Sequence, residues 1–412
     1  MTIGTTWAGT HTFGAGTLHL PTTMEEAQHL VAGADRIRAL GSRHSFNDLA
    51  DSPGDLISLR EVPLGLEVDA ENGSATVHGS LTYGAVAAEL DAAGFAMPAL
   101  ASLPHISIAG AVATATHGSG DRTPNLAGVV TAVEMIGADG ELLWLERGDA
   151  DFPGAVVALG ALGVVTRLRL AVEPTFGIRQ DVLNEVRWET VLERFDEITA
   201  AAHSVSIFTR WAEDAVDQIW IKSRDDVAPA ELFGGVFATT RQHPILGVDA
   251  INATEQGGTI GPWYDRLPHF RMGFTPSNGS EIQSEYLMDR RHAVAAIEAL
   301  RGLREQLIPL LQVCEIRTMA ADDLWLSAAY ERDTVAFHFT WHAQPDAVQA
   351  LLPEVERALA PFAARPHWGK WFAMGREELE QVFPRIGDFR ALAARLDPTG
   401  TFRNAYLDRL VL

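Results

Sequence analysis

The segment on which the interpretation of this chain depends is Gly41-Ser42-Arg43-His44-Ser45-Phe46-Asn47-Asp48. It follows the short apolar run 37–40, which predicts a buried strand. Glycine, serine and asparagine directly after a strand leave backbone N–H groups free to line a concavity that holds an anion. Arg43 adds a fixed positive charge that suits a pyrophosphate. Phosphate binding does not need an imidazole, so His44 is either a surface histidine in a turn or a nucleophile held against a cofactor.

This loop resembles the pyrophosphate loop of the vanillyl-alcohol-oxidase-type flavoproteins, in which a histidine at the position of His44 often carries FAD covalently. Three further blocks resemble one branch of that superfamily, the alditol (xylitol) oxidases, and together the blocks span nearly the whole chain. They are Ala101-Ser102-Leu103-Pro104-His105-Ile106-Ser107 continuing to His117-Gly118-Ser119-Gly120, then Glu315-Ile316-Arg317, and then His367-Trp368-Gly369-Lys370. The resemblance implies FAD linked covalently through His44.

Length and composition limit the kind of protein this is. A chain of 412 residues is too long for one compact core, so we expect two domains. Hydrophobic residues make up 47% and charged residues 21%, which is typical of a globular protein. The net charge of -22 argues against nucleic acid or an anionic membrane as a partner, because both would be repelled. The single cysteine, Cys314, excludes an internal disulfide and a multi-cysteine metal site.

Lysine is rare in this chain: only Lys222 and Lys370 are lysines among 32 basic residues. A lysine here is therefore not routine surface composition. The N-terminus has no basic segment followed by an apolar core, and no apolar run approaches about 20 residues. From these features we expect a cytoplasmic enzyme without a membrane partner, and we expect it to be a monomer.

The N-terminal part predicts an α+β nucleotide-binding unit rather than a Rossmann sheet. A capping box at 22–25 precedes a helix at 27–34, strands follow at 56–59 and 75–78, and a second helix covers 81–93. No G-x-G-x-x-G motif follows a strand, which disfavours a nicotinamide enzyme. The pattern changes near Pro174, where aromatic-rich strands and longer helices, including 191–202 and 290–307, begin.

The run 108–116 is built almost wholly from small residues. Small side chains let the backbone approach a large flat ligand, although tight helix packing is the alternative interpretation. By resemblance, Ser102 lies beside the flavin N5 and the substrate, and the glycine-rich turn 160–166 holds the ADP half of the cofactor. The cofactor-binding residues expected on this basis are Gly41, Ser42, Arg43, His44, Ser45, Ser102, Ser107, Gly110, Thr114, His117, Gly118, Val165 and His367.

Two predicted strands carry the polar residues expected to meet a substrate. In 313–317, alternation with a period of two places Glu315 and Arg317 on one face. In 335–341, large apolar residues share one face, and His338 and Thr340 share the other. Such a polar face suits a ligand with several hydroxyl groups, although a solvated sheet face with a Glu–Arg pair is the alternative. His338 and His342 lie four apart on a strand without a third ligand, so we expect no metal site.

Lys370 completes the set of residues expected to meet the substrate, because a desolvated lysine can act as a base or stabilise an alkoxide. The resemblance implies a two-domain α+β fold of the vanillyl-alcohol-oxidase type with a mixed-sheet substrate (cap) domain. We expect the FAD-binding domain at 1–174, the substrate-binding domain at 175–370, and a C-terminal tail, 371–412, that returns to the FAD domain.

The expected reaction is oxidation of a terminal CH₂OH of a polyol such as xylitol or sorbitol, with O₂ reduced to H₂O₂. By resemblance, Arg317 and Lys370 are catalytic, and Ser102, Glu315, Arg317, Thr340 and Lys370 bind substrate. An aldonolactone oxidase or dehydrogenase is the alternative, because it shares FAD and His-Trp-Gly-Lys. A non-catalytic flavin-binding protein is a second alternative, which leaves the polar strand faces unexplained.

Overall fold

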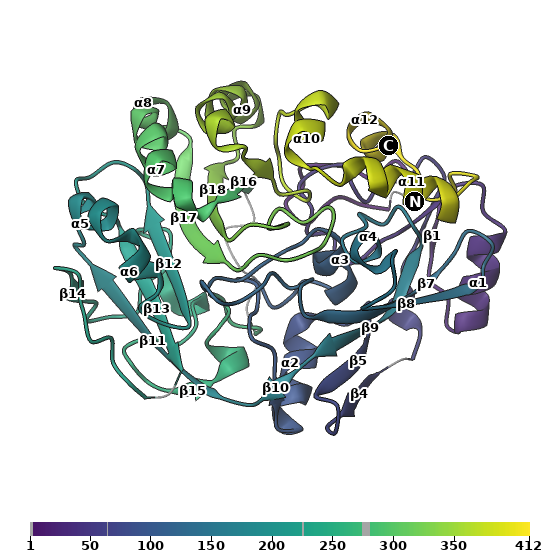
Figure 1. The fold of residues 1–412 in the computed structure, drawn as a ribbon, viewed down its shortest axis with the longest axis horizontal. Coiled ribbons are helices and arrows are strands. Elements are labelled where there is room, and N and C mark those ends of the chain that lie inside the picture. The colour runs from purple at the N-terminus through teal and green to yellow at the C-terminus, as the bar shows by residue number, and fades with distance from the viewer. Residues whose placement is uncertain (1–2, 64, 225, 274–280) are drawn as a thin grey trace.

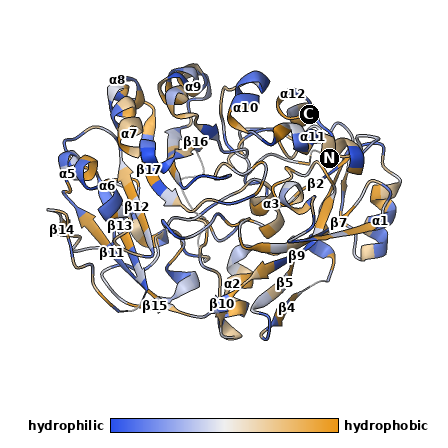
Figure 2. Ribbon diagram, viewed as in Figure 1, coloured by the Kyte–Doolittle hydropathy of each residue, from blue (hydrophilic) through white to orange (hydrophobic). Residues whose placement is uncertain are grey.

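Two large antiparallel sheets lie toward opposite ends of the computed structural model, which describes residues 3–63, 65–224, 226–273 and 281–412 (Figure 1). Hydrophobic residues concentrate in strands such as β7 and hydrophilic residues on peripheral helices such as α10 (Figure 2). Within the described ranges, no helix is long and apolar enough to cross a membrane.

The N-terminal part contains a five-stranded sheet with the strand order β4-β5-β9-β7-β8. A separate three-stranded parallel sheet has the order β1-β3-β2, and the predicted cofactor loop begins where β2 ends. The strands of these sheets are β1 (Leu18–His19), β2 (Ile37–Ala39), β3 (Asp55–Ile57), β4 (Leu66–Asp69), β5 (Ser74–His78), β7 (Val130–Ile136), β8 (Leu142–Glu146) and β9 (Val164–Ala171). The helices are α1 (Met24–Ala32), α2 (Tyr83–Ala92), α3 (Ile108–Ala113) and α4 (Phe152–Ala155).

The second large sheet has the order β14-β11-β13-β12-β17-β18-β16-β19, with β15 pairing to β11. The family resemblance implied a mixed sheet, whereas the described strand pairings in this sheet are antiparallel. Short connections join antiparallel neighbours such as β12 and β13, and parallel neighbours would need longer crossovers. The strands are β11 (Gly177–Asn184), β12 (Ser204–Thr209), β13 (Gln218–Arg224), β14 (Val236–Phe237), β15 (Gly261–Pro262), β16 (Glu281–Asp289), β17 (Leu311–Met319), β18 (Thr334–His342) and β19 (Arg365–Pro366).

Helices cover one face of this second sheet. Apolar side chains of α7 and α9 share a buried cluster with Phe337, Phe339 and Trp341 of β18. The face of β18 that carries the large apolar residues is therefore the packed face, as the alternation predicted. The helices on this side are α5 (Trp188–Glu193), α6 (Phe195–Thr199), α7 (Ala293–Gly302), α8 (Arg304–Leu307) and α9 (Pro345–Leu359).

The C-terminal tail packs on the N-terminal core. The helices α10 (Arg376–Val382), α11 (Ile386–Leu396) and α12 (Ala405–Leu410) contribute to the same buried cluster as α2 and α3. The buried Arg38 donates to the carbonyl of Phe402 at 2.6 Å, and the side-chain amide of Asn404 donates to the carbonyl of Leu49 at 3.0 Å. Both chain ends lie on this side of the molecule (Figure 1).

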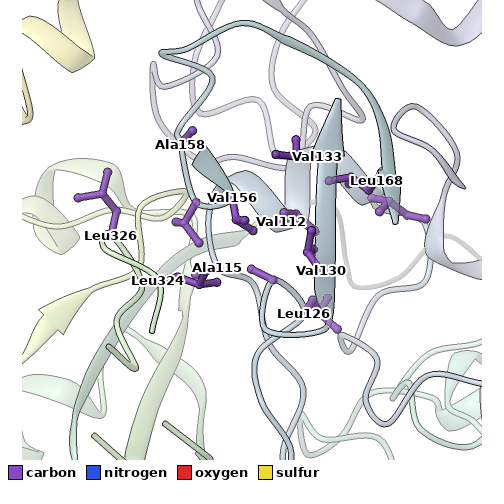
Figure 3. Packing of buried hydrophobic residues seen from close by; sticks show 14 of the residues in the cluster. Val112, Ala115, Leu126, Val130, Val133, Val156, Ala158, Leu168, Leu324 and Leu326 are labelled. Atoms are coloured by element: carbon purple, nitrogen blue, oxygen red, sulfur yellow. The ribbon is translucent and has the colours of Figure 1, made fainter. Parts of the chain in front are cut away.

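A connection of the second sheet also reaches this core. Figure 3 shows Leu324 and Leu326, which follow β17, packed near Ala115 and Val156. The change of sheet falls between β10 (Glu173–Pro174), which pairs with β6 (Phe95–Ala96), and β11. We therefore propose the division at residue 174 and the assignment of 371–412 to the first unit, which the contacts of Phe402 and Asn404 support.

Three sequence predictions about helices need correction. The helix predicted at 290–307 is a 3₁₀ turn at 290–292 followed by α7 and α8, which Leu303 separates. The N-cap of α1 is Thr23, whose hydroxyl accepts a hydrogen bond from the backbone amide of Glu26 at 3.1 Å. The capping residues therefore lie one position later than the predicted 22–25. The helix predicted at 191–202 begins at Trp188 and is interrupted at Arg194, whose φ of -125° and ψ of 28° lie outside the helical region.

Candidate active site

One cavity of about 290 Å³ brings the predicted cofactor loop and the predicted substrate strands together. Its wall combines the segment 38–46, the small-residue block around α3, and the polar faces of β16, β17 and β18. The predicted site residues that line it are Gly41, Ser42, Arg43, His44, Ser45, Ser102, Ser107, Gly110, Thr114, His117, Val165, Glu315, Arg317, Thr340, His367 and Lys370.

Gly118 was also predicted to line the cofactor, but it does not contribute to the cavity wall. A Cβ at this position would lie 2.6 Å from the carbonyl oxygen of Leu100, so the glycine allows two backbone segments to pass closely. Its carbonyl accepts a hydrogen bond from His117 Nδ1 at 2.8 Å. Gly118 therefore supports the wall from behind.

The cofactor loop is fixed against the small-residue block by reciprocal serine contacts. The Ser42 amide donates to Ser107 Oγ at 3.3 Å, and the Ser107 amide donates to Ser42 Oγ at 3.0 Å. A Cβ at Gly41 would lie 2.4 Å from Ser107 Oγ, so only glycine fits this approach. Arg43 adopts a φ of 64°. Its Nη1 donates a hydrogen bond to the carbonyl of Ile3 at 2.8 Å, so this N–H group is not directed at the cavity.

The rest of the cofactor wall is formed by closely approaching backbone. A Cβ at Gly79 would lie 2.9 Å from Cβ of Ala109 and 3.1 Å from the carbonyl of Val165, and a Cβ at Gly163 would lie 2.6 Å from the carbonyl of Ile136. A cavity wall of glycine, alanine and serine next to a strand end fits a dinucleotide with a flat ring system. The residues present are therefore compatible with FAD.

His44 lies in this wall as a half-buried, neutral imidazole. Burial lowers its pKa to about 4. Its Nδ1 lies 2.9 Å from the carbonyl of Ser42, and its ring stacks on Trp7 with the centroids 5.4 Å apart. A neutral imidazole retains a lone pair on one ring nitrogen, which a covalent bond to a cofactor requires.

Glu285 is the centre of the polar wall, and the sequence analysis did not identify it. Its carboxylate lies 2.6 Å from Lys370 Nζ, 2.8 Å from Arg317 Nη2 and 3.0 Å from His117 Nε2, and the side chain is 1% exposed. Burial alone would raise the pKa of the Glu285 carboxyl, but Lys370, His117 and Arg317 together hold it well below its usual range. Period-two alternation in 281–289, the same signal as in β17, places Glu285 on the polar face of β16 and could have identified it.

Glu315 and Arg317 share the cavity-facing side of β17, as predicted, while Cys314 and Ile316 pack in the apolar cluster behind the sheet. Glu315 accepts from His269 Nε2 at 2.7 Å and lies 3.6 Å from Arg317 Nε. Burial would raise the pKa of Glu315, but Arg317 and His269 keep it well below its usual range. Glu315 is therefore an ionised acceptor in the cavity.

The segment carrying Lys370 is tied directly to the cofactor loop. The side-chain amide of Asn47 donates to the carbonyls of Trp368 and Lys370, each at 2.9 Å, and the Phe46 amide donates to the carbonyl of Gly369 at 2.7 Å. Burial lowers the pKa of Lys370, and the negative charge of Glu285 opposes that shift. Lys370 is thus a largely buried cation, with its side chain 14% exposed, whose position is set jointly by Glu285 and by the predicted cofactor loop.

The described residues contain no group of three or more histidine, cysteine, aspartate or glutamate side chains that could hold a metal ion. The two histidines of β18, His338 and His342, lie in different environments. His338 lines the cavity near Glu315, whereas His342 is an exposed residue at the end of β18.

Comparisons with known proteins first define the class. Residues 17–146 match the family described as FAD binding domain, and residues 274–410 match D-arabinono-1,4-lactone oxidase. A solved cholesterol oxidase from Brevibacterium sterolicum superposes with a TM-score of 0.81 at 15% identity, covering 99% of this chain and 96% of that chain. The fold is that of the vanillyl-alcohol-oxidase-type FAD flavoproteins.

Full-length relatives then define the family. An alditol oxidase from a Streptomyces species is 44% identical over 410 residues, which cover 99% of this chain and 98% of that protein. An L-gulono-1,4-lactone dehydrogenase from Mycobacterium tuberculosis is 29% identical over 428 residues, at 99% coverage of both. This chain belongs to the alditol oxidase family.

Proposed function

We propose that this protein oxidises a terminal primary hydroxyl of an acyclic polyol, such as xylitol or sorbitol, to the aldehyde, with O₂ reduced to H₂O₂. The observation that carries the proposal is the charged cluster of the buried Glu285 and Arg317 with the largely buried Lys370. It faces the same cavity as the cofactor loop and lies beside hydroxyl-binding groups on Ser102 and Thr340. The similarity to an alditol oxidase supports the choice of a polyol.

The cofactor-binding residues proposed are those of the 41–45 loop, the α3 block, Val165 and His367. When bound, FAD supplies hydride acceptance from the carbinol carbon and the subsequent transfer of two electrons to O₂. The protein binds the polyol chain, excludes water from the site and manages the hydroxyl proton.

The hydroxyl proton is where Lys370 and Arg317 act. A primary alcohol has a pKa near that of water, so loss of hydride is slow unless negative charge on its oxygen is stabilised. Lys370 donates one hydrogen bond to Glu285 at 2.6 Å, which leaves two of its three N–H groups for other acceptors. Arg317 stays protonated, so it stabilises charge without accepting a proton. Glu315, Ser102 and Thr340 then hold the hydroxyl groups further along the chain.

An assay of H₂O₂ release across polyols and aldonolactones tests the proposed reaction. We expect turnover of xylitol and sorbitol and little turnover of the lactones. The lactone alternative is favoured by one observation, the match of residues 274–410 to D-arabinono-1,4-lactone oxidase. Oxidation of lactones without oxidation of any polyol would establish that alternative.

Replacing His44 by alanine is expected to convert covalently bound FAD into dissociable FAD. The motivation is a half-buried neutral imidazole that lines the cavity inside the proposed pyrophosphate loop. Wild-type protein precipitated with acid should keep its yellow colour in the pellet, and the His44→Ala pellet should be colourless. His105→Ala is the matched control, because His105 is a nearby histidine whose Nε2 contacts the carbonyl of Met272 instead. FAD found wholly in the wild-type supernatant would contradict the proposed linkage.

Replacing Glu315 by glutamine is expected to weaken polyol binding. The change removes a charge-assisted hydrogen bond, worth about 1.5–3 kcal/mol, so KM for xylitol should rise about 10- to 100-fold. FAD content should be unchanged, because Glu315 lies on the substrate strand β17. Absorbance at the flavin maximum, normalised to protein, measures that content. Loss of FAD in this variant would instead place Glu315 in cofactor binding or folding.

We propose further that the enzyme is a cytoplasmic monomer, as expected from the sequence, and that its partners are the polyol and O₂. Sedimentation analysis of the purified protein tests the monomer, and cell fractionation tests the location.

A further inference from the structure

Lys222 is a buried cation whose position the proposed reaction does not explain. It lies on β13, is 1% exposed, and makes no ion pair with a carboxylate among the described residues. Its Nζ donates to the carbonyls of Leu267 at 2.5 Å and Pro268 at 3.2 Å, and it lies 3.1 Å from His269 Nδ1. Nζ also lies 5.9 Å from the ring centroid of Trp220. A buried charge held by carbonyls, an imidazole and an aromatic face, without a carboxylate partner, is costly, so a residue that only filled space here would be expected to be apolar.

His269 connects Lys222 to the substrate cavity. Its Nε2 lies 2.7 Å from Glu315 Oε1. Phe208 and Trp220 contact the ring edge to face, with centroids 5.5 Å and 5.1 Å away, so the orientation of the imidazole is fixed by packing. The amide of His269 also donates to the carbonyl of Ser102 at 3.1 Å, which ties this loop to a second proposed substrate residue.

The hydrogen-bonding pattern defines the protonation of all three groups. An ammonium has three N–H donors and no acceptor, and Lys222 has three acceptors within reach. His269 Nδ1 must then accept, so in a neutral imidazole the proton lies on Nε2. That Nε2–H donates to Glu315, which is an acceptor when it is ionised. Without the Lys222 charge, His269 is free to adopt the opposite tautomer, whose Nε2 lone pair would face the Glu315 carboxylate.

We propose that Lys222 and His269 are positioning residues that hold Glu315 ionised and correctly oriented for the hydroxyl groups of the substrate beyond the reacting one. The pair thereby determines specificity for polyhydroxylated substrates. This inference rests on the proposed function, because it takes Glu315 as a substrate-binding residue.

The pKa values of Lys222 and His269 support this assignment. Burial lowers the pKa of Lys222 to about 7, against the opposing effect of Glu315. Burial likewise lowers the pKa of His269 to about 4, so the imidazole is neutral at ordinary pH. The charged and titratable groups that face Lys222 are His269 from its loop and Glu315 and Arg317 from β17. In the wild type, KM for xylitol should therefore rise as pH increases through about 7.

The test is steady-state oxidation of xylitol by the FAD-loaded enzyme, with Lys222→Met as the main variant. We expect KM to rise about 10- to 100-fold, the range given by loss of a hydrogen bond to a charged group, while kcat changes little. The KM rise with pH should be absent in this variant. If Lys222→Met does not fold, Lys222→Gln removes the charge and keeps amide donors for the carbonyls.

Two further variants distinguish a positioning role of Lys222 from a purely structural role. Gln218 lies on the same face of β13, is fully buried, and bonds the carbonyl of His243 and the indole of Trp220. Gln218→Met should lower thermal stability without changing KM. His269→Gln carries an amide that cannot change tautomer and still donates to Glu315. The fold increase in KM caused by Lys222→Met should therefore be smaller in the His269→Gln background than in the wild type.

Different results would overturn the proposed function and the positioning role of Lys222 and His269. Wild-type enzyme that oxidises lactones but no polyol overturns the proposed function, and the variants are then compared on the lactone that it does oxidise. Unchanged KM in Lys222→Met, an equal KM rise in Gln218→Met, or additive effects of Lys222→Met and His269→Gln would each overturn the positioning role.

Discussion

Replacing Lys370 by methionine is expected to slow anaerobic reduction of the flavin by saturating xylitol about 10²–10⁴-fold, the range of general acid–base assistance. The reason is that Lys370 is a largely buried cation in the proposed substrate cavity, fixed by Glu285 at 2.6 Å and by the proposed cofactor loop through Asn47. Methionine fills a similar volume but can neither stabilise negative charge on the substrate oxygen nor accept its proton. Stopped-flow absorbance of the flavin measures the rate.

Lys370→Arg is the matched comparison, because arginine keeps the charge but does not deprotonate. Since Glu285 favours the protonated form of Lys370, we expect Lys370→Arg to retain more of the rate than Lys370→Met. The His44 linkage and the reaction of the reduced enzyme with O₂ should be largely intact in both variants. Normal flavin reduction together with slow reoxidation would instead assign Lys370 to the reaction with oxygen.

Replacing Glu285 by glutamine is expected to affect stability and catalysis together. The carboxylate is the shared partner of Lys370, Arg317 and His117, so its neutralisation leaves two buried cations with less compensation. Breaking a buried ion pair by removing one partner costs about 3–5 kcal/mol. We expect a clearly lower Tm and slower flavin reduction, because Lys370 and Arg317 lose the group that positions them. Differential scanning calorimetry and stopped-flow absorbance measure the two effects.

The loss of stability in Glu285→Gln should depend on pH in a defined direction. Because the folded-state pKa of Glu285 lies well below 4.5, its stabilisation is present above pH 4.5 and is lost as pH falls through the folded pKa. The Tm difference between wild type and Glu285→Gln should therefore shrink in acid. Glu356→Gln is the control, since Glu356 is a buried carboxylate whose partners, the Tyr286 hydroxyl and the Ala373 amide, are neutral. A Tm loss in Glu356→Gln as large as in Glu285→Gln would argue against the ion-pair explanation.

The features that could be predicted from the sequence are local ones. The loop 41–48 follows a strand and contains the residue types that expose backbone N–H groups, so its part in the wall of a binding cavity could be predicted without the fold. Alternation in β17 and β18 correctly separated the polar cavity faces of Glu315, Arg317 and Thr340 from the packed faces behind them. The scarcity of lysine identified Lys370, because composition is a property of the chain itself.

Only the tertiary structure determined which charges meet. Glu285 and Lys370 are 85 residues apart, and Lys222 and His269 are 47 apart, yet each pair lies within hydrogen-bond distance. Buried ion pairs of this kind depend on strand order and register, which local patterns do not encode. The same holds for Gly118, which lies behind the cavity wall because it packs against the backbone of Leu100. The sequence alone therefore predicted that the loop 41–48 and the polar strand faces belong to one site. The pairing of β16 with β18 and the packing of 267–269 against β13 decided which charges lie close together, because charge interactions depend on distance in space.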